Sequence, residues 1–237
     1  IYTLSLHDAL PISIHGPRGY FAAFAQDDWD PGVLLGGLGE EWAMARTSVK
    51  PYACCRHVHG AVDAVLRLRG EHGLRPEAVA GVDVATYAVA ATYDGTDART
   101  LLGAQMSMPY AVAAALCDGE LGLPQFAAER RGGADVTTLM SAVRVRADAD
   151  LDRLYPALRP ADVRIRRTDG PDLRLRVDEP YGEPGNPLDD DALAAKFRAL
   201  CGPSLGASRT GEVLRAAWAF TDLGPLTHGL GTLGGHA

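Results

Sequence analysis

The stretch DVRIRRTDGPDLRLRVDEP, residues 162–180, constrains the fold more than any other part of the sequence. Val163 and Ile165 alternate with charged residues before the polar segment TDGPD, and apolar residues alternate again from Leu173 to Val177. A period of two places alternate side chains on opposite faces of a strand. Two such runs joined by a segment with Gly and Pro predict a β-hairpin that has one apolar face and one arginine-rich face.

The arginine-rich face allows two interpretations. Clustered arginines are typical of nucleic-acid binding, but five acidic residues interleave with these, namely Asp162, Asp169, Asp172, Asp178 and Glu179. This mixture favours a solvated face whose charges pair with one another. The net charge of −7 also argues against nucleic acid as a partner, because phosphate binding requires a basic surface.

Helical periodicity dominates the rest of the chain. Apolar residues at helical spacing from His57 predict a helix that ends at Gly70 or Gly73, and the apolar run 108–122 predicts a buried helix. Shorter patterns predict strands at 82–86 and 143–148, a short helix at 135–143, and helices at about 189–200 and 211–220. The sum is an α+β domain over residues 46–201, with helical segments at 14–45 and 202–237.

The composition indicates the cellular location to expect for this chain. Four cysteines without a CxxC pair do not suggest a disulfide framework in a chain of 237 residues, so we expect a reducing, cytoplasmic location. No stretch approaches the roughly 20 apolar residues of a membrane span. The segment IYTLSLHDALPIS, residues 1–13, lacks the basic start of a signal peptide. It looks like translated sequencing-adapter read-through, and we expect it not to belong to the natural protein.

The stretch KPYACCRHVHGAVDA, residues 50–64, gathers the reactive side chains. Cys54 and His57, or Cys55 and His59, lie at spacings that put two zinc ligands on one helix face. Zinc requires three or four ligands, however, and no second pair of ligands follows at a recognisable spacing. An interpretation without a metal is therefore favoured over a zinc site.

Two non-metal interpretations of this stretch remain open. The segment enters a helix near residues 55–57, where backbone N–H groups and the helix dipole attract anions. Lys50, Arg56 and His59 add positive charge, which suits a carboxylate ligand. Lys50 and Lys196 stand out further because arginine outnumbers lysine 21 to 2, and a lysine can lose its proton where an arginine cannot. The alternative is a capped helix start with no ligand.

Three blocks of the sequence resemble the MmgE/PrpD family in order and spacing. They are KPYACCRHVHGAVDA, QMSMPYAVAAALCDGELGLPQF and VRIRRTDGPDLRLRVDEPYGEPGNPLDDDALAAKF, and the resemblance runs from about Gly16 to the last helix. The family includes 2-methylcitrate dehydratase, cis-aconitate decarboxylase and iminodisuccinate epimerase. The resemblance implies a small α+β domain beside a large all-helical domain, an active site between them, and a homodimer. It also implies small di- or tricarboxylate substrates and no cofactor.

The resemblance also implies roles for individual residues. The conserved lysine of the family falls on Lys50, its downstream histidine on His59, and the tyrosine of its S-x-P-Y block on Tyr110, so these three are the expected catalytic residues. The decarboxylase carries a histidine where this chain has Cys55, and we expect Cys55 and Arg56 to bind substrate.

The expected function follows from the resemblance and from its main departure. Only residues 14–45 and 202–237 correspond to the helical domain, which supplies further catalytic side chains in the family. We expect the C-terminal part of an enzyme that removes a proton α to a carboxylate, with a dehydratase of the 2-methylcitrate type favoured. The alternatives are a decarboxylase or epimerase of the same family, and an inactive fragment that serves as a lid or dimerisation module.

Overall fold

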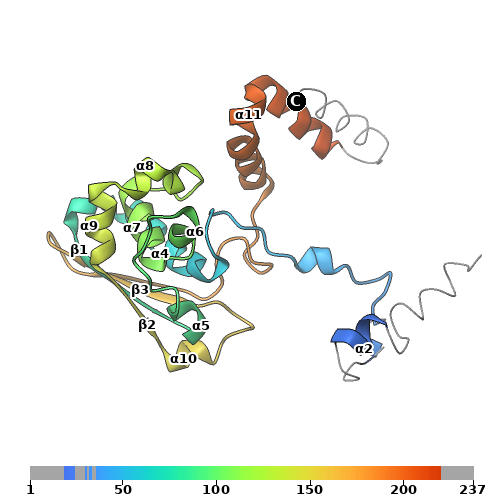
Figure 1. Ribbon diagram of the computed structural model, residues 1–237, viewed down its shortest axis with the longest axis horizontal. Helices are drawn as coiled ribbons and strands as arrows, with labels where there is room; N and C mark the ends of the chain where they lie inside the picture. The colour runs from blue at the N-terminus through green and yellow to red at the C-terminus, as the bar shows by residue number, and fades with distance from the viewer. Residues whose placement is uncertain (1–18, 25–29, 31, 34–35, 220–237) are drawn as a thin grey trace, which may run out of the picture. The chain divides into compact units, whose positions relative to one another are not determined.

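The computed structural model describes residues 19–24, 30, 32–33 and 36–219 (Figure 1). The chain divides into two compact units, residues 1–46 and 47–237. Within the first unit, α2 spans Tyr20–Phe24 and the 3-10 helix η1 spans Ala43–Arg46. The segment 1–13, much of 14–45 and the end of 202–237 lie outside the described residues, so the domain boundaries given above stay predictions.

A four-stranded mixed sheet forms the centre of the second unit (Figure 1). Its strands are β1 (Val79–Thr86), β2 (Val143–Ala147), β3 (Ala161–Arg167) and β4 (Leu173–Val177), in the order β2-β1-β3-β4. β1 runs parallel to β2 and antiparallel to β3, and β3 runs antiparallel to β4. The pairing of β3 with β4 confirms the predicted hairpin, and the mixture of helices with this sheet confirms the α+β class.

The apolar face of the sheet is covered by helices. Val82 lies between Val143 and Ile165 in the register, and all three side chains are buried. Helix α4 (His59–His72) contacts β3 and β4, and α7 (Met108–Asp118) contacts β2, α4 and α9 (Ala134–Ser141). Figure 1 shows α4, α7 and α9 gathered on one side of the strands. This packing buries the apolar side chains that the alternating pattern placed on one face.

Two helices end where the glycines predict. α4 ends at Gly73, whose φ of 57° is left-handed, so the choice between Gly70 and Gly73 falls on Gly73. α7 ends at Gly119, with a φ of 80°. It begins at Ser107, whose side chain accepts a hydrogen bond from the backbone N–H of Tyr110.

Several short helices connect these elements. They are η2 (Arg56–Val58), η3 (Pro76–Ala78), α5 (Ala88–Ala91), α6 (Leu101–Gln105), η4 (Pro124–Phe126), α8 (Ala128–Arg131) and α10 (Ala149–Asp152). Each has three to five residues, which is too short to show a helical period in the sequence.

The last helix differs from the prediction. α11 spans Asp190–Trp218, continues through Pro203, and is interrupted at Gly206, where φ is 73° and ψ is 162°. The predicted end at Leu200 is therefore too early. Proline removes one backbone hydrogen bond but keeps a helical φ, and the structure places the break three residues later, where glycine permits a non-helical backbone.

Candidate active site

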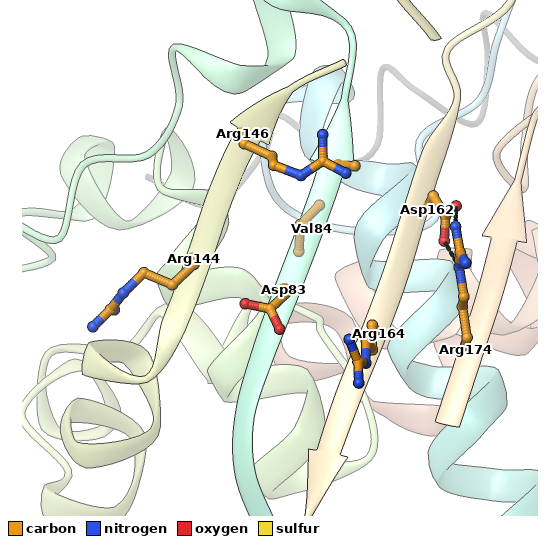
Figure 2. A pocket seen from close by; sticks show the side chains of 8 residues that line it. Asp83, Val84, Arg144, Arg146, Asp162, Arg164 and Arg174 are labelled. Carbon is orange, nitrogen blue, oxygen red and sulfur yellow. Dashed lines mark hydrogen bonds and ion pairs between the residues drawn. The ribbon is translucent and has the colours of Figure 1, made fainter. Parts of the chain in front are cut away.

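Two hollows in the second unit are candidates for a binding site. The first, of about 340 Å³, lies on the arginine-rich face of the sheet (Figure 2). Its arginines have acidic partners: Arg174 lies 2.5 Å from Asp162, and Arg164 lies 2.5 Å from Asp172. The charges on this face are thus largely matched by aspartates, as expected of a solvated face.

The second hollow lies beside Lys50 and has a volume of about 810 Å³. Its walls come from the loop before α4, from α6, from the segment before η4, from the loop after β4, and from α11. Most side chains that line it are apolar, including Leu102, Met106, Leu123, Leu188 and Leu200. We take this pocket as the candidate site because it combines apolar walls with a few charged groups.

Backbone hydrogen bonds fix the loop that carries Lys50. The N–H of Cys55 donates to the carbonyl of Gln105 at 2.9 Å, and the Gln105 side chain donates to the carbonyl of Ala53 at 2.8 Å. At the other end, the N–H of Val49 donates to the carbonyl of Gly182 at 2.8 Å. A Cβ at Gly182 would lie 1.9 Å from the carbonyl oxygen of Val49, so only glycine permits this approach.

A buried carboxylate joins two walls of the pocket. Asp63 on α4 is 2% exposed and accepts the Tyr52 O–H at 2.5 Å and the backbone N–H of Tyr181 at 2.6 Å. Burial raises the pKa of Asp63, and the two hydrogen bonds oppose that shift. Tyr52 and Tyr181 both line the pocket, so Asp63 fixes the spacing of the two loops that carry them.

His59 lies behind the pocket wall at the first turn of α4. It is fully buried, its Nδ1 lies 2.9 Å from Nη1 of Arg56, and its Nε2 lies 3.4 Å from the carbonyl oxygen of Cys54. Burial, followed by the positive charge of Arg56, lowers the pKa of His59 to about 3. Because Arg56 can only donate, the pattern assigns a neutral imidazole that carries its proton on Nε2.

Arg56 connects His59 to a buried acid. Its Nε donates to Oε1 of Glu183 at 2.8 Å, and Glu183 also accepts from Ser48 Oγ at 2.9 Å. Burial alone would raise the pKa of Glu183, but these hydrogen bonds outweigh it and the pKa is lowered. The Arg56 side chain is 13% exposed, so most of it packs inside the domain.

The structure brings some of the predicted site residues together and separates others. Lys50 and Cys55 line the pocket. Arg56 and His59 lie behind its wall, and so does Tyr110, whose buried hydroxyl donates to the carbonyl of Gln125. The catalytic and substrate-binding roles given to these five residues stay predictions.

Two charged residues of the pocket, Lys196 and Glu120, are not among the predicted site residues. Lys196 on α11 lines the same pocket as Lys50 and is half-buried. The charges of both lysines contribute to the low pKa of His59, after burial and Arg56. The rarity of lysine singles out Lys196 in the sequence, but no local pattern connects it with the pocket that Lys50 lines.

The described residues give no support to a zinc site. Within them, no group of three or more His, Cys, Asp or Glu side chains is placed to hold a metal ion. Burial raises the pKa of Cys54 to about 12, whereas a zinc ligand is a thiolate.

Among the described residues, no helix is both long enough and apolar enough to cross a membrane.

Comparison with known proteins agrees with this architecture. The family model of the MmgE/PrpD C-terminal domain matches residues 52–219. The chain belongs to the MmgE/PrpD family. This confirms the resemblance seen in the three sequence blocks. The matched range contains the sheet, all of α11 and the pocket loops from Tyr52 onward, and Lys50 lies two residues before it.

Two curated proteins are similar in sequence to this chain. Both are cis-aconitate decarboxylases from Aspergillus terreus, one of them from a defined strain, and each is 26% identical to this chain over 210 residues. The similarity covers 81% of this chain and 42% of each relative. The chain therefore spans less than half the length of the curated relatives it matches.

Proposed function

We propose that this chain is the C-terminal part of a lyase that binds small di- or tricarboxylates and removes a proton α to a carboxylate. The observation that carries the proposal is the placement of Lys50 at the largely apolar 810 Å³ pocket, where no acidic side chain of the described residues forms an ion pair with it. Lys50 is exposed, so its ammonium group is accessible to a carboxylate that enters the pocket.

In a dehydration, a base removes the proton from the carbon α to a carboxylate. The electron pair left on that carbon forms a double bond, and hydroxide leaves the adjacent carbon with a proton, as water. Negative charge builds on the carboxylate before the leaving group departs, and the Lys50 ammonium stabilises that charge. The family resemblance gives His59 an acid/base or carboxylate-binding role and assigns further catalytic side chains to the helical domain.

The other predicted residues differ in whether they line the pocket or are buried behind its wall. Cys55 lines the pocket and limits its shape beside Lys50. The resemblance gives His59 and Tyr110 direct contact with substrate, but their burial favours positioning roles. His59 holds Arg56 and the loop of Cys54, and Tyr110 holds the carbonyl of Gln125 in the pocket wall.

Decarboxylation is the second candidate, and the 26% identity to cis-aconitate decarboxylase favours it. Here the bond to a carboxylate breaks, CO₂ leaves, and the electron pair is protonated. The same lysine stabilises the charge that develops. The residue Cys55, which replaces a histidine of the decarboxylase according to the resemblance, is the reason to place dehydration first. Epimerisation, in which the proton returns to the opposite face, is the third form of the same chemistry.

The proposal is tested by Lys50→Ala in a version of the protein that carries the helical domain of the family. We expect kcat/KM to fall by at least about 100-fold, because a preorganised charge is lost where negative charge develops. Arg75→Ala, which removes an exposed cation outside the pocket, serves as the control. Product analysis separates water loss from CO₂ release. Full activity of Lys50→Ala would exclude Lys50 from the mechanism.

An inactive lid or dimerisation module is the non-enzymatic alternative. A thermal-shift titration of the chain with citrate separates the two, since a formed anion site raises the melting temperature on binding. Sedimentation velocity tests the homodimer that the family resemblance implies.

A further inference from the structure

The positively charged side chains that line the pocket in the described structure are lysines and not arginines. Arginine outnumbers lysine 21 to 2, yet no arginine of the described residues lines the pocket, whereas Lys50 and Lys196 both do. An ammonium is a compact charge with rotatable donors, while a guanidinium is a broad planar fork. Two ammonium groups therefore leave more of the pocket free for a small ligand.

Lys196 lies on a face of α11 that otherwise lines the pocket with small or apolar side chains. Four further residues of α11 line the pocket at spacings of three and four, namely Ala192, Ala195, Ala199 and Leu200. Residues at these spacings share one side of a helix. Lys196 is the one polar side chain among these five, and the three alanines leave its half-buried stem room to reach into the pocket.

The two ammonium groups have no matching acids. Among the described residues, no acidic side chain forms an ion pair with Lys50 or Lys196, in contrast to the arginines of the exposed sheet face. Glu120 is the one acid in the described part of the chain that lines the pocket, and its Oε1 accepts a hydrogen bond from Gln125 at 3.2 Å. The pocket thus holds two positive charges against one negative charge, between mostly apolar walls.

We infer that Lys196 is a second carboxylate-binding residue, and that with Lys50 it selects ligands bearing at least two carboxylates. The inference rests on the proposed function, because it assigns a second anchor within the same pocket. One carboxylate lies at the loop that enters α4, and another lies at α11. A monocarboxylate satisfies one ammonium and leaves the other unpaired.

The scarcity of lysine makes a direct test possible. We propose to acylate the 237-residue chain with a water-soluble succinimidyl acetate and to follow Lys50 and Lys196 by peptide mass spectrometry, with the N-terminal amine as the internal reference. The probe is propane-1,2,3-tricarboxylate, and acetate at equal ionic strength is the comparison. With four-fifths of the pocket occupied, the tricarboxylate slows acylation of both lysines about fivefold, and acetate does not protect both.

Two single-residue variants extend the test to binding affinity. Lys196→Gln weakens tricarboxylate binding, measured by calorimetry, by about 10-fold to 100-fold, since a charge-assisted hydrogen bond is lost. Acetate binding changes much less. Arg198→Gln is the matched control, because it removes one positive charge from an exposed position on the same helix, outside the pocket.

The outcomes distinguish this inference from the function on which it rests. If Lys50 is protected while Lys196 reacts at an unchanged rate, the pocket binds carboxylates and the role of Lys196 is refuted. If neither lysine is protected, the carboxylate site itself is refuted, and the inference fails with it. Equal weakening by Lys196→Gln and Arg198→Gln would show an effect of net charge, and would also overturn the inference.

Discussion

His59 illustrates how burial decides what a histidine can do. Its imidazole is fully buried and lies beside the permanent charge of Arg56, so its pKa falls to about 3. An imidazole with that pKa stays neutral near pH 7 and holds its neighbours by hydrogen bonds. In the described structure it acts on the pocket through Arg56 and the carbonyl of Cys54.

This burial makes stability depend on pH. In the unfolded chain the imidazole takes up a proton near pH 6.5, but in the folded chain it does so only near 3. Between these values the unfolded state binds more protons, so stability falls as the pH is lowered. From about pH 7 to about pH 5, His59 alone removes roughly 2 kcal/mol from the free energy of unfolding.

Urea unfolding at several pH values checks the prediction for His59. His59→Gln keeps a polar side chain that does not titrate, and we expect its free energy of unfolding to fall less steeply below about pH 7. His72→Gln, on the exposed end of the same helix, is the control. An unchanged slope in His59→Gln would show that the imidazole is not buried in its neutral form.

The Tyr52–Asp63 hydrogen bond is a second prediction at this scale. Tyr52→Phe leaves one oxygen of a buried carboxylate without its partner, and Asp63→Asn weakens both of its hydrogen bonds. We expect each change to cost about 1–3 kcal/mol of unfolding free energy. The double variant should cost clearly less than the sum, measured by a double-mutant cycle. Additive costs would mean that the two side chains act independently.

The sequence could identify some of these residues and not others. The family resemblance named Lys50 and Cys55 in a loop that enters a helix, and both residues line the pocket. The apolar run around Tyr110 predicted its burial, but its hydrogen bond to the carbonyl of Gln125, fifteen residues further along, follows from no local pattern. Lys196 lies 146 residues after Lys50, and its place at the same pocket follows from tertiary packing alone.

At the scale of elements, predictions succeeded where period and caps agreed. The hairpin of β3 and β4 has strict alternation on both sides of a turn, and α4 and α7 each end at a left-handed glycine. α11 was divided at Leu200 because Gly202 and Pro203 resemble a helix end. The structure continues the helix there, and local propensity did not distinguish Pro203 from Gly206 as the point of the break.

The break in α11 leads to a prediction with a matched control. Gly206 has a φ of 73° and a ψ of 162°, a region open almost only to glycine, and a Cβ there would meet no atom within 4 Å. Gly202 has equal space but lies within the helix. Gly206→Ala should lose about 1–3 kcal/mol of unfolding free energy, while Gly202→Ala should gain about 0.5–1 kcal/mol. Equal effects, measured by urea unfolding, would contradict the interrupted helix.

At the scale of the whole molecule, the charge of the chain opposes that of the pocket. The net charge of −7 repels a tricarboxylate, whereas two lysines at the pocket attract it. Added salt screens both effects, but they change affinity in opposite directions. The lysines line the pocket itself, whereas most other charges are spread over the rest of the chain and are screened beyond about 8 Å at physiological salt. The attraction by the lysines should therefore dominate.

The sign of the salt dependence tests which charge governs binding. We expect the Kd of propane-1,2,3-tricarboxylate, measured by calorimetry, to rise severalfold between about 20 mM and about 300 mM KCl. In Lys196→Gln the affinity is lower from the start and its dependence on salt is shallower, because one attractive charge is absent. An affinity that increases with salt would mean that the acidic molecule as a whole controls the encounter, and that the ligand does not bind between the two lysines.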